Sequence, residues 1–159
     1  MKSRLLVIIF LSLLLTGLSS SAQNIIRQAA CSNADIKHQA DSIKALMAEK
    51  GFIVIKEASM TMESGYEMPV IVPLTEGTWY QFVFIGDITS KLYEVRMFDW
   101  SERQVVYQKK MWGDVDGNVI SYDYIPKVTE YHMIKPVQEN KKKKKDLCGY
   151  VMLLKRVAK

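Results

Sequence analysis

The stretch GTWYQFVFIGD, residues 77–87, decides the fold class of this chain. Almost every central position in it is apolar, so a strand formed here has no polar face. One face would carry Tyr80, Phe82 and Phe84, and the other Trp79, Gln81, Val83 and Ile85. A strand that is apolar on both faces is covered on both faces. The pattern therefore predicts a central strand, and the remaining segments can be placed around it.

The residues after this strand alternate between apolar and polar. Tyr93, Val95 and Met97 would share one face, and Glu94 and Arg96 the other, which indicates a sheet with one solvated face. Turn residues separate such segments at intervals of about 10 residues, which favours an antiparallel sandwich or barrel over βαβ units. The strands expected here are Thr78–Ile85, Lys91–Asp99, Gln104–Trp112, Val119–Ile125, Lys127–Val137 and Cys148–Lys155.

Two further strands are expected upstream, at Phe52–Met62 and Met68–Leu74. Pro69 and Pro73 lie near the ends of the second one, which predicts an edge position. The total of about eight strands is the number typical of a jelly roll. We therefore predict a mainly β domain over residues 52–159, an antiparallel β-sandwich or jelly roll with one N-terminal helix packed on it.

Residues 23–51 form an N-terminal helical segment in this interpretation. Ser32 or Asn33 would cap the helix, with Asp35 in its first turn, and Gly51 would end it. An apolar stripe predicts the face that packs on the sheet, and consists of Ile36, Ala40, Ile43 and Met47.

Residues 1–22 are interpreted as a signal peptide. Lys2 and Arg4 precede an apolar run, and Ala22 ends a pattern of small residues typical of a cleavage site. The run is shorter than the ~20 residues that a membrane span needs. We therefore expect cleavage after Ala22 and export to the periplasm or the extracellular space, with no transmembrane span left in the mature chain.

The positive charge of the chain is concentrated in one run, Lys141–Lys145. The formal net charge of +5 falls to +3 without Lys2 and Arg4, and to −2 without the five lysines as well. Nucleic-acid binders spread basic residues over one face, so this partner is excluded. We expect a solvated loop with few hydrogen bonds between two strands. The alternative is an electrostatic contact with anionic lipid or polysaccharide.

Two cysteines remain after cleavage, Cys31 and Cys148. An exported chain with a small, even number of cysteines usually pairs them, so we predict a disulfide bond between the two. The alternative is two buried thiols.

Three segments carry a resemblance to a known family. Residues 74–87 place a glycine before an aromatic strand, residues 93–99 end a strand in an Asp turn, and residues 121–131 place a proline between Tyr124 and a late Tyr131. This arrangement resembles the bacterial pre-peptidase C-terminal type of secreted β-sandwich. Thr129 and Glu130 replace a glycine usual in that family. The resemblance implies a sandwich fold and an accessory or binding role, with no catalytic residue.

No catalytic or metal-binding motif stands out. His38 and His132 have no second ligand at metal spacing. Asp114, Asp116 and Asn118 alternate as calcium ligands do. However, Gly117 between them is explained by a hairpin turn, so we expect no metal and no cofactor.

A second functional class is a hydrolase acting on cell-wall or polysaccharide material. Its carboxylate pair could come from Glu94 and Glu130 or from Glu63 and Glu67, but strand carboxylates are more often solvent-facing.

Exposed aromatic residues suggest a binding role, although most aromatic side chains belong to cores. The candidates for a sugar-stacking or peptide-binding surface are Tyr66, Trp79, Trp100 and Trp112. Our leading hypothesis is a small exported bacterial β-sandwich with a non-enzymatic binding or accessory role in the cell envelope, where an envelope protein or a polysaccharide is the partner. A flat aromatic patch would favour this hypothesis, and a cleft with converging carboxylates would favour the hydrolase.

Overall fold

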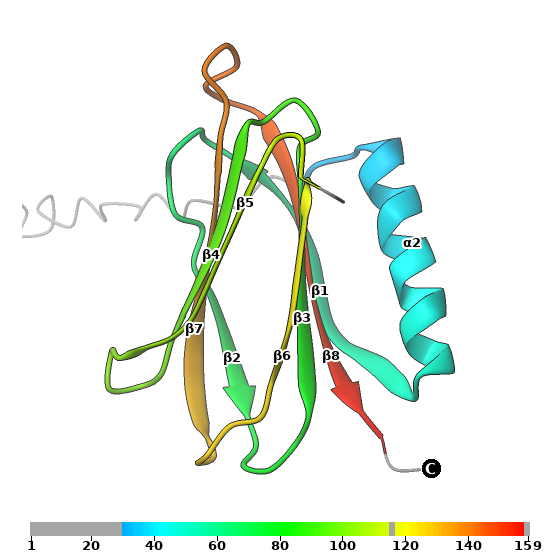
Figure 1. The fold of residues 1–159 in the computed structure, drawn as a ribbon, viewed down its shortest axis with the longest axis vertical. Coiled ribbons are helices and arrows are strands. Elements are labelled where there is room, and N and C mark those ends of the chain that lie inside the picture. The colour runs from blue at the N-terminus through cyan, green and yellow to red at the C-terminus, as the bar shows by residue number, and fades with distance from the viewer. Residues whose placement is uncertain (1–29, 115–116, 158–159) are drawn as a thin grey trace, which may run out of the picture.

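The computed structural model describes residues 30–114 and 117–157. One helix and eight strands follow one another along this part of the chain (Figure 1). Their bounds are α2 (Ala34–Glu49), β1 (Phe52–Met62), β2 (Val70–Leu74), β3 (Tyr80–Gly86), β4 (Leu92–Phe98), β5 (Gln104–Met111), β6 (Val119–Tyr124), β7 (Glu130–Glu139) and β8 (Leu147–Arg156). The expected signal peptide lies outside the described residues.

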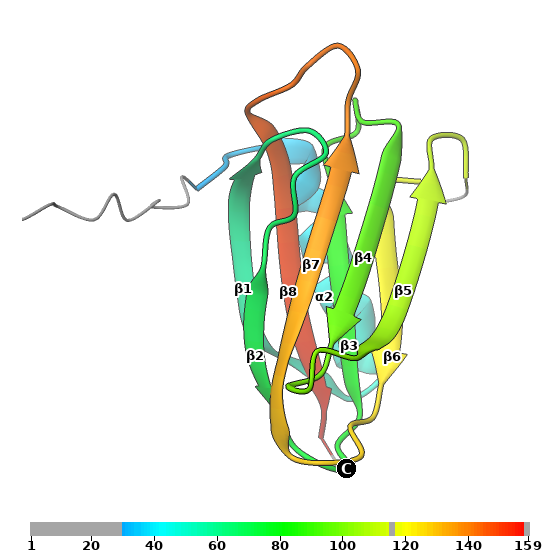
Figure 2. The same ribbon diagram turned by 90° about the vertical axis from the view of Figure 1, so that its left-hand side faces the viewer.

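The strands form two four-stranded sheets, in the orders β1-β8-β3-β6 and β2-β7-β4-β5. Every pairing is antiparallel. This is the jelly-roll sandwich that the sequence predicts. The predicted edge strand β2 lies at a sheet edge, and β3 lies between β8 and β6. Figure 2 shows the two sheets face to face, with α2 behind the first.

Strand β3 is covered on both faces, as its apolar pattern predicts. Tyr80, Phe82 and Phe84 point into the core between the two sheets. Val83 and Ile85 point into a second core, between the first sheet and α2. Each fully buried side chain of this size contributes roughly 1.5–3 kcal/mol, so the two cores explain why this strand holds the layers together.

Helix α2 begins at the second of the two expected caps. The Asn33 Oδ1 atom accepts hydrogen bonds from the backbone N–H groups of Asp35 (3.0 Å) and Ile36 (3.1 Å). These bonds satisfy two of the amides that a helix start leaves unpaired. Gly51, with φ of +82°, follows the C-terminal end, a backbone angle that only glycine adopts without strain.

A disulfide joins Cys31, just before α2, to Cys148 in β8, with the Cα atoms 5.6 Å apart. The predicted pairing is therefore confirmed. The bond ties the helix to the centre of the first sheet across 117 positions of sequence. Disulfides of this kind are typical of oxidising compartments outside the cytosol.

Strand β7 differs from its expected bounds. It begins at Glu130 rather than Lys127, and continues to Glu139. The preceding residues form a turn against the β2–β3 loop. There, the backbone N–H of Gly77 donates to the Pro126 carbonyl, and that of Glu76 to Thr129 Oγ1, both at 3.0 Å. These bonds to another loop replace the ladder bonds that would have extended the strand.

The loop that contains Lys141–Lys145 is exposed, as expected, but the expectation of few hydrogen bonds is wrong. The backbone N–H groups of Lys142 and Lys143 donate to Asn140 Oδ1, both at 3.0 Å. The Lys144 carbonyl accepts from the backbone N–H of Ser64 at 2.8 Å. The lysine side chains are exposed, with Lys143 3.9 Å from Asp87 and Lys145 3.8 Å from Glu63. Asn140 and Ser64 hold the backbone, so repulsion between the charges does not unfold the loop.

Candidate binding surface

The outer face of the β2-β7-β4-β5 sheet carries an apolar row across three strands. Ile71 on β2 pairs with Met133 on β7, which in turn pairs with Phe98 on β4. Ile71 is half exposed. Above this row lies a hollow of about 460 Å³, named here the aromatic hollow. It is lined by Ile71, Phe98, Asp99, Trp100, Glu102, His132, Met133 and Lys135.

One aromatic ring, that of Trp100, lines the hollow, and a second, that of Tyr131, contacts it from beside the hollow. Trp100, in the β4–β5 turn, is 67% exposed, and Tyr131 on β7 is 53% exposed. Their ring centroids are 5.9 Å apart, with the planes inclined at 51°. Residues so exposed contribute little to the core, so their rings are free to contact a ligand.

The turn that carries Trp100 is fixed by Asp99. Its Oδ1 accepts from the backbone N–H of Arg103 at 2.9 Å, and its Oδ2 accepts from Arg103 Nε at 2.8 Å. Glu102 takes a positive φ of 60°, which lets the turn close. A fixed turn loses little conformational entropy when its ring contacts a ligand.

The middle of the same outer face is occupied by charged side chains. Glu67 contacts Lys135 at 2.8 Å and Arg96 at 3.3 Å. Arg96 also contacts Glu94 at 2.8 Å. Glu94 lies on the face that the sequence predicts to be solvated, yet it is only 7% exposed, because Arg96, Tyr107 and Lys109 cover it.

The carboxylates at this face are therefore already occupied by cations. Hydrogen bonds from the Arg103 backbone and guanidinium hold the pKa of Asp99 below its ordinary value of 3.8. Glu67 and Glu94 are each shared between two basic side chains. Carboxylates paired in this way suit a structural or binding role better than proton transfer.

The four aromatic candidates from the sequence do not form one surface. Trp100 lies at the aromatic hollow. Trp79 is half-buried beside α2, packed edge-on against Phe52 at 5.7 Å between ring centroids. Tyr66 and Trp112 are exposed in the β1–β2 and β5–β6 loops, at the opposite end of the sandwich from Trp100.

Tyr131 and Tyr107 are the ring-bearing residues that the sequence reasoning missed. Both lie on strands; Tyr131 entered the sequence analysis only through the family resemblance, and Tyr107 only as part of the expected strand Gln104–Trp112. The register places Tyr131 opposite Pro73 and Tyr107 opposite Arg96, on the outer face. The sequence did draw attention to Tyr131, because it follows the late proline of the family resemblance. However, the face to which a strand residue points depends on the register of the strand.

The other sequence candidates have local structural roles. Asp114 Oδ2 accepts from the backbone N–H of Met111 at 2.7 Å, and Asn118 exchanges side-chain hydrogen bonds with Gln39. Asp116 lies outside the described residues. Within the described part of the chain, no group of three or more His, Cys, Asp and Glu side chains is placed to hold a metal ion. The absence of a metal stays a prediction.

Comparison with known proteins gives fold likenesses only. No protein-family model and no curated protein matches the chain. The pre-peptidase C-terminal resemblance is therefore supported only in the sandwich fold that it implied.

Three solved structures show low similarity. The chain is 8% identical to AlgX of Pseudomonas aeruginosa, covering 66% of this chain and 27% of that one, with a TM-score of 0.45. It is 14% identical to a CBM4 structure, covering 66% and 77%, with a TM-score of 0.41. It is 11% identical to a cleaved adhesin domain of Lys-gingipain from Porphyromonas gingivalis, covering 64% and 74%, with a TM-score of 0.41. Likenesses this weak assign no ligand.

The described helix is not long and apolar enough to cross a membrane.

Proposed function

We propose that this protein is a non-enzymatic binding domain that holds a polysaccharide chain at the aromatic hollow. The observation that carries the proposal is the pair formed by Trp100 and Tyr131, two exposed rings in contact with each other, of which Trp100 lines the hollow. A sugar ring presents C–H groups on its faces and hydroxyls on its rim. It therefore fits an aromatic surface with polar groups around it.

Charged groups also line the hollow, and they offer hydrogen-bond partners for the hydroxyls of a sugar. Asp99, Glu102 and Lys135 line the hollow together with the apolar floor. Small-ligand sites typically combine an apolar lining with a few placed polar groups, in volumes of ~300–1,000 Å³. The hollow, at about 460 Å³, falls in this range and has room for a short stretch of sugar rings.

The hydrolase alternative is less well supported, because glycosidases use one carboxyl whose pKa is raised so that it can donate a proton. At the hollow, Asp99 is held ionised by Arg103. None of the four glutamates proposed from the sequence, Glu63, Glu67, Glu94 and Glu130, lines the hollow.

The Cys31–Cys148 disulfide favours an oxidising compartment, and the first 22 residues have the pattern of an export signal. We place the protein in the periplasm or outside the cell, where polysaccharide is available to it.

Affinity measurements on matched variants test this function. Wild-type protein is screened by calorimetry and affinity electrophoresis against cellulose, chitin and galactan fragments and peptidoglycan. Trp100→Ala and Tyr131→Ala should each weaken the best interaction by about 30-fold, the cost of a binding hot spot of ~2 kcal/mol. Trp112→Ala removes an equally exposed tryptophan at the other end and should change nothing. Unchanged affinity in Trp100→Ala would place the binding site elsewhere.

A further inference from the structure

A second surface lies at the opposite end of the sandwich from the aromatic hollow. Four loops meet there, named here the lysine end: residues 63–69, 87–91, 112–114 and 140–146 (Figure 2). Backbone hydrogen bonds join them. Ser64 donates to the Lys144 carbonyl (2.8 Å), Trp112 to that of Lys91 (2.9 Å), and Lys91 to that of Glu139 (2.7 Å). The loops form one connected surface.

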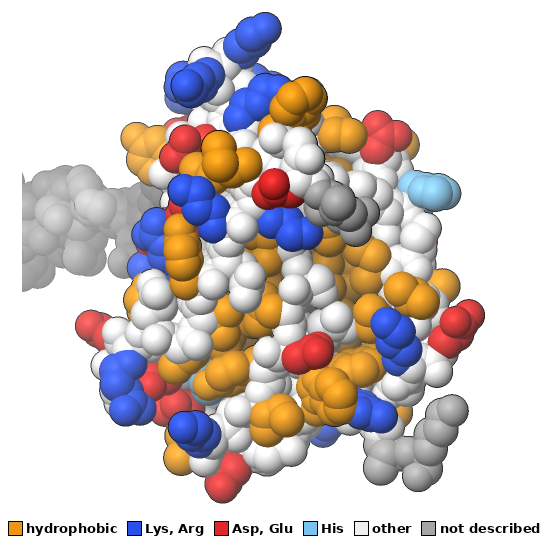
Figure 3. Space-filling view, viewed as in Figure 1, with side chains coloured by type: hydrophobic (Ala, Val, Ile, Leu, Met, Phe, Trp, Pro, Cys, Tyr) orange, Lys and Arg blue, Asp and Glu red, His pale blue; other side chains and the backbone are white. Residues whose placement is uncertain are grey.

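The backbone of the lysine loop is held in place by Asn140, which is buried, and by Ser64, which is partly buried. Asn140, only 5% exposed, accepts from the backbone of two lysines and donates through Nδ2 to the Thr89 carbonyl (3.0 Å). Ser64 Oγ accepts from the Asn140 backbone at 2.8 Å. The loop 140–146 holds five lysines and one acid, a net charge of +4. Figure 3 shows Lys and Arg side chains gathered at this end of the molecule.

Large apolar side chains are exposed on the other loops and strand ends at this end of the sandwich. Each neighbouring loop or strand end contributes one or two, between 57% and 69% exposed: Tyr66, Ile88, Met111 and Trp112. The Lys91 Nζ atom lies 3.8 Å from the centre of the Trp112 ring. Packing within the domain does not explain these exposed apolar and aromatic side chains. They lie at the same end as a basic loop, on elements that are far apart in sequence.

The four loops together carry six lysines and five acids, a net charge of +1, but the lysines are concentrated in one exposed loop. Asp87 is buried and bonded to Thr89 and Cys148. Glu63 faces Lys145 at 3.8 Å, and Asp114 accepts from the Met111 backbone. Glu139 and Asp146 are exposed, but they flank the five lysines at the base of the loop.

We propose that the lysine end docks onto the surface of an anionic lipid bilayer. Lysines near such a surface each contribute about 1 kcal/mol, a fivefold gain in affinity, and the attraction fades within a Debye length. Tryptophan and tyrosine favour the interface between headgroups and acyl chains, where isoleucine and methionine also gain from burial. A soluble polyanion would use the lysines but would leave the four apolar tips in water.

This docking would present the aromatic hollow away from the membrane. Strand β7 runs from Glu130, next to Tyr131 at the hollow, to Glu139 at the lysine end. Ten extended residues span ~30 Å, and so the two surfaces are separate. The lipid contact does not depend on the proposed polysaccharide site, and each can fail without the other.

Vesicle flotation with matched variants tests the charge component. The intact protein is mixed with vesicles of phosphatidylcholine alone or with phosphatidylglycerol added. Lys141→Ser with Lys142→Ser should weaken binding to the anionic vesicles by about 25-fold. Lys50→Ser with Lys127→Ser removes the same charge from two exposed lysines outside the lysine end and should change affinity less than twofold. All variants share one N-terminus, so its contribution cancels. Equal losses in both pairs, or equal binding to neutral vesicles, would overturn the proposal.

Quenching by brominated lipid tests the orientation. The fluorescence of wild type and of Trp100→Phe should be quenched on anionic vesicles, and Trp112→Phe should lose most of that quenching. Quenching that disappears in Trp100→Phe instead would overturn the proposal. The proposal would also be overturned if the protein bound soluble dextran sulfate and Trp112 stayed unquenched on vesicles. That result would assign the lysine end to a polyanion.

Discussion

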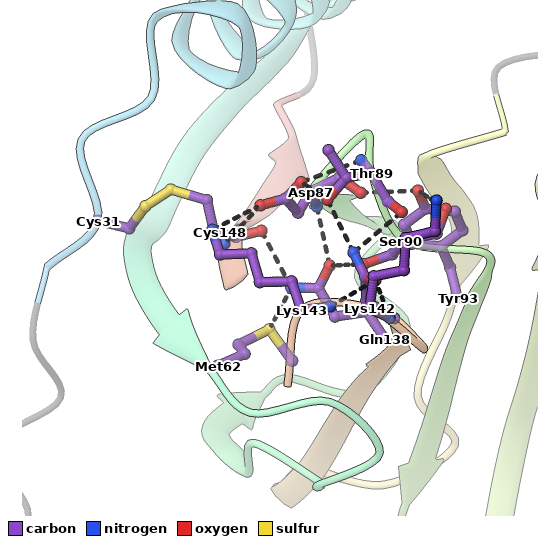
Figure 4. Close-up of polar contacts among 11 residues, drawn as sticks. Cys31, Met62, Asp87, Thr89, Ser90, Tyr93, Gln138, Lys142, Lys143 and Cys148 are labelled. Atoms are coloured by element: carbon purple, nitrogen blue, oxygen red, sulfur yellow. Dashed lines mark hydrogen bonds and ion pairs between the residues drawn. A yellow bond between two sulfur atoms is a disulfide. The ribbon is translucent and has the colours of Figure 1, made fainter. Parts of the chain in front are cut away.

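Asp87 connects three segments of the chain at one end of the sandwich (Figure 4). Its Oδ1 accepts from the backbone N–H (3.0 Å) and hydroxyl (2.7 Å) of Thr89, and its Oδ2 accepts from the backbone N–H of Cys148 at 3.2 Å. Lys143 Nζ stands 3.9 Å from Oδ2. Burial alone raises the pKa of Asp87, but these bonds outweigh burial and hold it below its ordinary value of 3.8.

Replacing this carboxylate should destabilise the fold. Asp87→Asn cannot accept all three hydrogen bonds, and a buried amide left without an acceptor costs about 1–3 kcal/mol. We expect a loss of about 2 kcal/mol in the free energy of unfolding, measured in urea near neutral pH. Asp123→Asn, on the exposed side of β6, is the control and should change stability by less than about 0.5 kcal/mol.

The same residue predicts a pH dependence. Because the folded pKa of Asp87 lies below the unfolded one, its contribution is complete above pH 3.8 and disappears as the pH falls through the lower folded value. The stability difference between wild type and Asp87→Asn should therefore shrink in acid. A difference that stays constant down to strongly acidic pH would show that lost packing, not lost charge, is responsible.

Single residues also mark the limit of the sequence reasoning. Trp100 could be found because it lies in a turn, where burial is least assured. Tyr131 could not, because a strand residue faces solvent or core according to register, and a shift of one position inverts the choice. Trp79 looked available as a binding residue, but α2 and the guanidinium of Arg156, 4.4 Å from the ring centre, cover it.

At the scale of elements, the strands and the helix follow from local patterns. The alternation of β4 and the two-sided apolar pattern of β3 predict both their existence and the layers they face. The start of β7 was misplaced because the Pro126–Thr129 turn is set by bonds to the β2–β3 loop, a contact between distant segments. The hydrogen-bonded backbone of the lysine loop was not predicted for the same reason. It depends on a contact between distant segments, since Asn140 and Ser64 come from different loops.

The attachment of α2 to the first sheet should depend on the disulfide. Replacing both Cys31 and Cys148 by Ala opens a loop of 117 positions and should lower the free energy of unfolding by about 2–5 kcal/mol. Urea unfolding of the double variant and of the reduced wild type should agree with each other. If the double variant and the reduced wild type unfold at the same urea concentration as the oxidised wild type, the disulfide does not stabilise the packing of α2 on the sheet.

At the scale of the whole molecule, the sandwich separates two surfaces of different chemistry. The aromatic hollow is lined by four apolar or aromatic side chains and four polar or charged ones, while the lysine end combines cations with exposed apolar side chains. The fold class could be predicted from strand patterns. The separation of Trp100 from Tyr66 and Trp112 could not be predicted from the strand patterns. It depends on which loops the topology brings to each end of the sandwich.

The central claim is that a polysaccharide occupies the aromatic hollow, and mapping amide and indole chemical shifts during a titration tests it most directly. Isotope-labelled protein is titrated with the oligosaccharide that binds best in the screen. Binding at the hollow should give saturable shifts concentrated at the Trp100 indole and at the amides of Phe98, Tyr131 and Met133, with Tyr66 and Trp112 unchanged. Saturable shifts at the lysine end or around Trp79, with the hollow undisturbed, would contradict it.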